Sequence, residues 1–377
     1  MSRKQKRRES VGCFGQKENN KRQSLDIMNK AVLFEVIPVR IFLIIMLVFY
    51  HAFAIFSGAW APITNYPLIP AYDIIDKLSC AALLETFVFI SGSILGFQLR
   101  TKGKDIVLTP RKIIWGKLRR LIVPSIVFSI LYIICLGASS DSILKVSYDI
   151  LNGVGHMWFL PMLFWCFVLT YLIELTGLKI KYVLPILGLA TLGSVMPLPL
   201  RLNSALYYLL FFYAGFYIEK NSVTIRLKSE IVLPISLLLF AITFILKLNV
   251  ENTNFNIIGG GGYLISSQVI NKGIRIIVLV ISRVLCASFG IVSLMSLSRL
   301  IVLHSDTSKW NGVIKLSNCC FGVYIFQQFI LKLLNKSILP FCIDAYLYPW
   351  IAFIITLFIS LILTILIRTT KLGRQLL

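Results

Sequence analysis

Apolar segments long enough to cross a lipid bilayer recur along this chain from residue 36 onwards. A helix needs about 20 apolar residues to cross the hydrocarbon layer, and its backbone groups must be bonded within the segment. We read ten spans, near residues 36–57, 78–99, 121–138, 156–176, 182–198, 204–218, 231–248, 276–298, 319–335 and 346–367. With 57% hydrophobic and only 14% charged residues, the chain is predicted to be an all-α, polytopic integral membrane protein of about ten transmembrane helices.

The cationic residues fall on one side of this predicted topology. Loops on the N-terminal side hold 28 of the 38 Lys and Arg residues, whereas segments 57–76 and 139–155 together hold only Lys145. Because Lys and Arg accumulate in cytoplasmic loops, an even number of spans places both termini in the cytoplasm. The same topology explains the net charge of +22, so we expect no nucleic-acid partner.

Three regions follow from this pattern. Residues 1–35 form a basic tail that we expect to be disordered and cytoplasmic, with no cleavable signal peptide. Residues 36–367 form the membrane domain, and residues 368–377 form a second, short cytoplasmic tail. The eight cysteines have no CxxC spacing and lie mostly in apolar segments, so we interpret them as buried hydrophobes and expect no metal site.

One arginine and one histidine share a face of the first span. Arg40 and His51, in "VRIFLIIMLVFYHAF", are eleven residues apart. On a helix this is about 20° past three full turns and roughly 16 Å of rise. The pair would link a cationic group at the cytoplasmic surface to a titratable group deep in the membrane. Intramembrane ionisable residues are functional candidates, and depth and alignment favour function for His51 over a packed histidine bonded to a backbone carbonyl.

Three other ionisable side chains lie in the outer half of the predicted spans. Glu85 and Arg283 lie at similar depth, where they would either serve a site or pair as structural support. His156, beside Trp158 at the start of a span, would belong either to a site or to an interfacial aromatic belt.

A basic run, "RKIIWGKLRRLIVP", precedes the third span and contains Lys117, Arg119 and Arg120. On spacing alone, such residues are more often topological anchors than ligands. They would also suit an anionic, phosphate-bearing donor. A histidine half a membrane away would then act as a general base toward a hydroxyl. Such a protein would pass an activated group from a cytoplasmic donor to an acceptor reached from outside.

Five segments together resemble a known membrane family. They are the Arg40–His51 pair, "LLETFVFISGSILGF" at 83–97, "KLRRLIVPS" at 117–125, "GHMWFLPMLF" at 155–164 and "NCCFGVYIFQQFI" at 318–330. In this order they resemble the membrane acyltransferase family often called acyltransferase family 3, whose members O-acetylate surface polysaccharides and related glycans. The resemblance covers most of the ten-span region and leaves out the basic tail.

The resemblance implies an O-acetyltransferase in a bacterial inner membrane. It would take an acyl group from acetyl-CoA, used as the donor substrate, and pass it to a hydroxyl of a cell-surface or lipid-linked glycan. Arg40, Lys117, Arg119 and Arg120 would lie near the coenzyme phosphates, and His51 at the chemistry. Either direct transfer or an acyl-enzyme on His51 is consistent with these residues.

The resemblance also gives expectations for the other candidates. Glu85 would orient or charge-balance His51, and Arg283, His156 and Trp158 would contact the substrate. One position departs from the family pattern, because many relatives carry a histidine after "VYIF" where this chain has Gln327. Glutamine forms hydrogen bonds but does not titrate near neutrality.

Two alternatives to the enzyme stay open at this stage. A transporter or flippase for a glycan or lipid precursor would also use buried charges, but its basic run would serve topology only. A scaffolding relative would need no reactive His51. The outer aromatics Trp60, Tyr66 and Tyr72 would either stack on sugar rings or anchor the chain at the membrane interface.

Overall fold

The computed structural model describes residues 34–377 except 64–65, 68, 138–141, 224–227 and 253–264. Of the predicted tail at residues 1–35, residues 1–33 lie outside this part, and the last two residues belong to the first helix. The described residues form helices and no strands. In chain order the α-helices are Phe34–Phe53 (the first helix), α2 (Pro70–Cys80), α3 (Leu83–Lys102), α4 (Lys104–Val107), α5 (Val123–Leu136), α6 (Ile143–Asn152), α7 (Phe159–Thr176), α8 (Ile180–Gly193), α9 (Leu202–Lys220), α10 (Ser229–Asn252), α11 (Ile265–Leu303), α12 (Asn311–Lys336), α13 (Leu339–Cys342), α14 (Tyr348–Thr369) and α15 (Lys371–Leu376).

Each of the ten predicted spans falls on a helical segment. Among the described residues, eight segments are long and apolar enough to cross a membrane: Phe34–Phe53, Pro70–Lys102, Arg111–Leu136, Gly155–Thr176, Ser229–Glu251, Ile276–Leu303, Asn311–Lys336 and Tyr348–Thr369. The remaining two predicted spans correspond to α8, a shorter apolar helix, and α9. The all-α membrane fold is therefore confirmed, while ten crossings and cytoplasmic termini stay predictions.

Close packing of α3 against α9 rests on glycine. Gly92 and Gly96 lie one helical turn apart on α3 and face the α9 backbone, and Gly215 of α9 faces α3 in the same way. A Cβ atom at Gly92 would lie 2.0 Å from the carbonyl oxygen of Phe212, and one at Gly96 would lie 2.3 Å from that of Phe216. Small residues spaced four apart let helix backbones approach closely in membranes.

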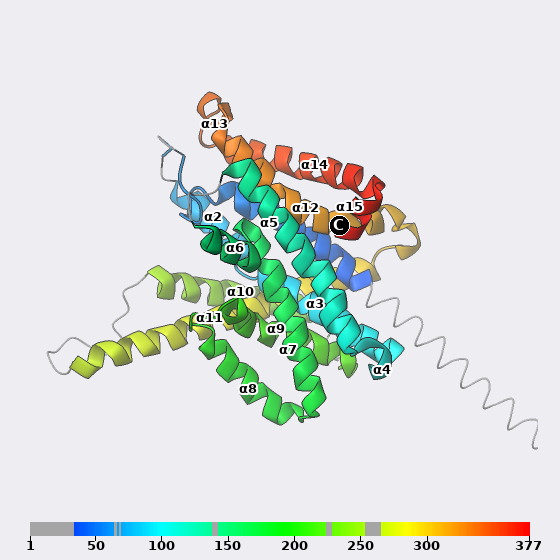
Figure 1. Ribbon diagram of the computed structural model, residues 1–377. Coiled ribbons are helices and arrows are strands. Elements are labelled where there is room, and N and C mark those ends of the chain that lie inside the picture. Colours follow the sequence, from blue (N-terminus) through cyan, green and yellow to red (C-terminus); the bar gives the residue numbers. More distant parts are fainter. Residues whose placement is uncertain (1–33, 64–65, 68, 138–141, 224–227, 253–264) are drawn as a thin grey trace, which may run out of the picture.

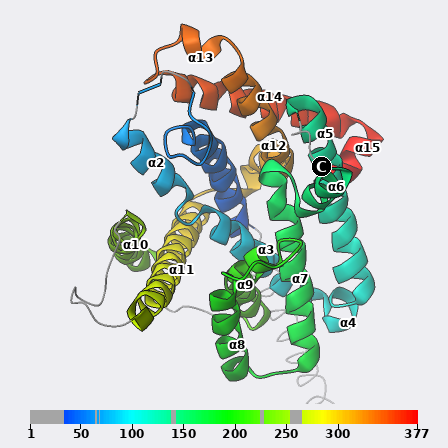
Figure 2. The same cartoon turned by 60° about the vertical axis from the view of Figure 1, so that its left-hand side comes forward.

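Two helix pairs flank the α3–α9 unit (Figures 1 and 2). The pair α10–α11 lies on one side of the bundle, and the pair α12–α14 lies on the other. The first helix contacts both sides, because its Glu35 carbonyl accepts a hydrogen bond from Ser298 of α11 and its Arg40 carbonyl accepts one from Cys320 of α12. This arrangement places His51 of the first helix beside α12.

Candidate active site

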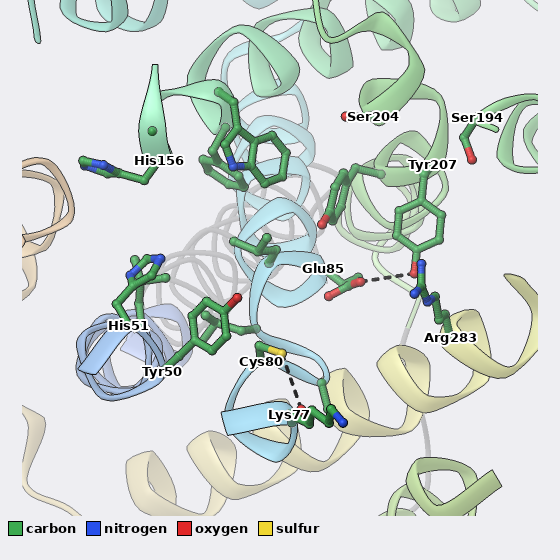
Figure 3. A pocket seen from close by; sticks show the side chains of 18 of the residues that line it. Tyr50, His51, Lys77, Cys80, Glu85, His156, Ser194, Ser204, Tyr207 and Arg283 are labelled. Carbon is green, nitrogen blue, oxygen red and sulfur yellow. Dashed lines mark hydrogen bonds between the residues drawn. The ribbon is translucent and has the colours of Figure 1, made fainter. Parts of the chain in front are cut away.

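A cavity of about 920 Å³ contains all the candidates that the sequence placed in the outer half of the membrane. It is lined by His51 of the first helix, Glu85 of α3, His156 and Trp158 of the turn Gly155–Trp158, and Arg283 of α11. Figure 3 shows His51 and His156 on one side of this cavity and Glu85 and Arg283 on the other. The fold therefore brings together side chains from four segments that are far apart in the sequence.

His51 is buried, and its side-chain hydrogen bonds go to two glutamines of α12. Its Nδ1–H donates to Oε1 of Gln327 at 3.0 Å, and its Nε2 accepts from Nε2 of Gln328 at 3.2 Å. These partners fit a neutral imidazole with its proton on Nδ1 and a lone pair on Nε2. The imidazole also stacks on the indole of Trp60, with 5.4 Å between ring centroids. His51 is therefore oriented so that Nε2 can accept a proton.

Glu85 was expected to orient or charge-balance His51, but its side-chain hydrogen bond goes to another residue, so direct orientation has no contact behind it in the described part of the chain. Charge balance stays a prediction. Oε1 of Glu85 accepts a hydrogen bond from the hydroxyl of Tyr207 on α9 at 3.1 Å, and Figure 3 shows the carboxylate directed away from His51. Among the described residues, no side-chain hydrogen bond joins Glu85 to His51. The side-chain partners of the imidazole come from α12 instead.

Arg283 pairs with a carboxylate other than Glu85. Its Nη2 and Nε donate to Oε1 of Glu251 on α10 at 2.8 and 3.1 Å. No ion pair joins Glu85 directly to Arg283 among the described residues, although the two charges interact electrostatically. A shared site and structural support both stay open for this pair. Both side chains line the same cavity, where Glu85 is buried and Arg283 is substantially exposed.

His156 has an acceptor oxygen beside each ring nitrogen. Its Nε2 lies 2.9 Å from the carbonyl oxygen of Ile325 and its Nδ1 lies 2.9 Å from Oε1 of Gln328, so a neutral imidazole donates to one of these two oxygens. Oε1 of Gln328 also accepts the backbone N–H of His156 at 3.2 Å. Gly155 has φ +58°, and a Cβ atom there would lie 3.0 Å from Oε1 of Gln328. The turn thus holds Gln328, which connects His156 to His51.

Sequence reasoning did not assign a role to Gln328. A signal was present, because the polar side chains Tyr324, Gln328 and Lys332 follow one another at intervals of four along α12, and all three line the cavity. Four-residue spacing places them on one face of α12.

Arg40 lines a second cavity, which adjoins the His51 cavity. The second cavity, of about 380 Å³, is lined by Arg40 and also by Leu47, Leu84, Phe159 and Tyr324. The last four side chains line the His51 cavity as well. Arg40 and His51 therefore lie in two neighbouring cavities along one helix, as their eleven-residue spacing predicts.

The basic run forms a third cavity of about 710 Å³. It lies beside two successive π-helices, Arg111–Trp115 and Leu118–Ile122. The π-helix is rare in proteins, and where it does occur it is often at a functional site. The cationic residues that line this cavity are Lys102, Arg111, Lys112, Lys117, Arg119 and Arg120. The ammonium of Lys117 lies 3.8 Å from the centroid of the Phe167 ring, a cation–π contact.

Arg40 and the basic run do not line one common cavity. A further cavity of about 430 Å³ lies between them, since it shares Lys102 and Gln98 with the basic cavity and shares Arg40 with the second one. Four cavities, each sharing lining residues with the next, therefore lie in a row between the basic run and His51.

Comparison with known proteins agrees with the resemblance seen in the sequence. A family model described as an acyltransferase domain, the third family of that name, matches residues 38–369. The matched range contains every candidate residue described above. The searches of curated proteins and of solved structures gave no match.

Proposed function

Because the chain belongs to acyltransferase family 3, we propose that it acts as a membrane O-acetyltransferase of a bacterial inner membrane. It would move the acetyl group of cytoplasmic acetyl-CoA to a hydroxyl of a cell-surface or lipid-linked glycan. The observation that carries this proposal is the row of adjoining cavities that joins a cationic end to a buried histidine. An anionic donor would bind at the cationic end, and acyl transfer to a hydroxyl requires a base, which the histidine at the other end would supply.

The cationic end would bind the phosphates of the donor. The guanidinium groups of Arg119 and Arg120 present planar sets of donors that match phosphate oxygens. The cavity beyond Arg40 is bounded by Leu47, Leu84 and Phe159, which would suit the thin, uncharged arm that carries a thioester. Arg40 would then hold the donor at the entrance to this apolar passage.

The chemistry would centre on Nε2 of His51. An acceptor hydroxyl takes the place of the Gln328 amide as the hydrogen-bond donor to Nε2, and its proton passes to that nitrogen. The hydroxyl oxygen attacks the thioester carbonyl, so that a C–O bond forms and the C–S bond breaks. The thiolate then takes the proton from His51. In the alternative with an acyl-enzyme, Nε2 attacks the thioester first, so that a C–N bond forms, the C–S bond breaks and the thiolate leaves. The acceptor hydroxyl then attacks the acyl-imidazole, the C–N bond breaks, and the hydroxyl proton passes to the thiolate.

The proposal is tested with purified protein in detergent, by measuring acetyl-CoA binding and slow thioester hydrolysis. Arg40→Ala should weaken binding by roughly 10- to 100-fold, because a charge-assisted hydrogen bond is worth about 1.5–3 kcal/mol. Arg40→Lys should restore only part of the affinity, since lysine lacks the guanidinium fork. His51→Ala should retain binding and lose roughly 10²- to 10⁴-fold in turnover.

His304→Ala is the matched control, because His304 is exposed in the structure and lines none of these cavities. It should leave both binding and turnover unchanged. Folded wild-type protein that neither binds nor hydrolyses acetyl-CoA would exclude the proposed donor.

A further inference from the structure

Cationic side chains gather around the His51 cavity, although the predicted outer segments contain few of them. Those that line it are Lys77, Lys247, Arg283 and Lys332, together with two carboxylates, Glu85 and Glu251. The excess of Lys and Arg in cytoplasmic loops does not account for cations at this depth. Charges in membrane segments are costly and usually mark a ligand pathway or a pair.

Three of these four cations interact with carboxylates. Lys77 forms an ion pair with Asp73 at 2.8 Å, and Arg283 forms one with Glu251 at 2.8 Å. Lys247 interacts electrostatically with Glu85. Two of these cations are thus paired directly, and the charge of Lys247 is offset through space by Glu85.

Lys332 differs from the other three. Within the described part of the chain, no carboxylate lies within ion-pair distance of its half-buried ammonium. Unlike Lys247, it has no electrostatic interaction with a carboxylate there either, because the charge that acts on it is another cation, Lys336. Its Nζ lies 3.8 Å from the ring centroid of Trp60, and the same indole stacks on His51. Lys332 is also one helical turn from Gln328, which bonds to His51. An uncompensated cation thus lies beside the proposed base, in a cavity open to a ligand.

We propose that Lys332 binds an anionic group of the acceptor, a carboxylate or a phosphate, next to the hydroxyl that His51 deprotonates. This inference rests on the proposed function and narrows it, because it assigns the acceptor to the acidic or phosphate-bearing glycans. A partly buried ion pair is screened less than one in bulk water, so Lys332 would select a charged sugar over a neutral one. On binding, the anion would replace the indole of Trp60 as the partner of the Lys332 ammonium.

The experiment compares three soluble probes for binding to the purified full chain: methyl β-glucuronide, glucose 1-phosphate and methyl β-glucoside. Wild type should bind at least one charged probe roughly tenfold tighter than the neutral glucoside. Comparison of the two charged probes distinguishes a carboxylate from a phosphate as the group recognised. Lys332→Met, which keeps the length and apolar stem of the side chain, should remove the preference, and Lys332→Arg should retain most of it.

Lys336→Met is the control on the same helix. Lys336 is exposed, does not line the cavity and donates to the carbonyl of Leu136. This variant should bind all three probes as wild type does.

Three results would overturn the inference: no preference for either charged probe in wild type, a preference that survives Lys332→Met, or an equal loss of neutral and charged probes in Lys332→Met. The last would mean that Lys332 only holds Trp60 against His51. Wild-type acetyl-CoA hydrolysis is measured in the same preparation. Hydrolysis without charge preference defeats the acceptor subsite alone, whereas charge preference without hydrolysis defeats the proposed function.

Discussion

The amide of Gln327 selects which ring nitrogen of His51 carries the proton. Gln327→Met removes the acceptor at Nδ1 while keeping the side-chain volume, so the imidazole loses its fixed tautomer. We expect turnover of acetyl-CoA to fall roughly 10- to 100-fold with little change in donor affinity, as for other groups that orient a reactive side chain. Separate measurement of kcat and KM for thioester hydrolysis checks this.

Gln327→Glu is the matched rescue, because a carboxylate oxygen can accept from Nδ1–H in the same place. It should recover much of the lost turnover. If Gln327→Met hydrolyses acetyl-CoA as fast as wild type, or if it loses donor binding to the same degree, Gln327 does not position His51.

At the residue scale, the sequence predicted where a side chain lies on its helix better than it predicted which residues that side chain bonds to. The spacing of Arg40 and His51 is a local property of one helix, so their shared face was visible in the sequence. The bonds from His51 to Gln327 and Gln328 join residues more than 270 positions apart, and helix periodicity carries no information on such contacts. Gln327 consequently looked like the loss of a titratable group, whereas in the fold it is the acceptor that fixes the histidine.

At the scale of the helices, the α3–α9 contact is sensitive to added volume. Gly92→Ala would place a methyl group against a backbone carbonyl, which cannot move without separating the two helices. We expect a loss of about 1–3 kcal/mol of stability, together with weaker activity, because Glu85 and Tyr207 lie on these two helices. The effect is measured as a change in Tm, from the fraction of protein that stays soluble in detergent as the temperature is raised.

Gly188→Ala provides the comparison, since no atom lies within 4 Å of a Cβ atom at that position of α8. It should be neutral or slightly stabilising, because alanine favours a helix over glycine by up to about 1 kcal/mol. Equal Tm values for the two variants would show that α3 and α9 tolerate a wider separation.

Element positions were largely predictable, and their internal geometry was not. Apolar runs locate helices because the bilayer imposes that conformation on any spanning segment. The same runs do not specify hydrogen-bond register, so neither the break between α2 and α3 at residues 81–82 nor the two π-helices around Gly116 could be predicted. Yet these π-helices carry the basic side chains that form the proposed donor site.

For the whole molecule, the charge asymmetry of the loops and the row of cavities have to agree. The row begins at the basic run, in a loop predicted to be cytoplasmic, and it ends at the His51 cavity near the predicted outer segments. Donor and acceptor proposals both need these ends on opposite sides of the membrane. Composition could indicate the orientation, but only the fold could show that the cavities at the two ends follow one another through shared lining residues.

Cysteine labelling in intact cells tests this orientation. Ala59, next to Trp60, and Asp105, next to the basic cavity, are both exposed in the structure. Each is changed to cysteine in a cysteine-free background that still hydrolyses acetyl-CoA. A membrane-impermeant maleimide should label Ala59→Cys in intact cells, and should label Asp105→Cys only after the membrane is made permeable.

The reverse pattern would place the basic run outside the cell, where no acetyl-CoA is available, and would remove the basis of both proposals. Labelling of both positions in intact cells would mean that the cavity row does not cross the bilayer.

The predicted pattern would require any acetyl group that reaches an outer acceptor to pass from the Arg40 cavity into the His51 cavity. The partition formed by Leu47, Leu84, Phe159 and Tyr324 would then be the point where the donor thioester meets the acceptor hydroxyl.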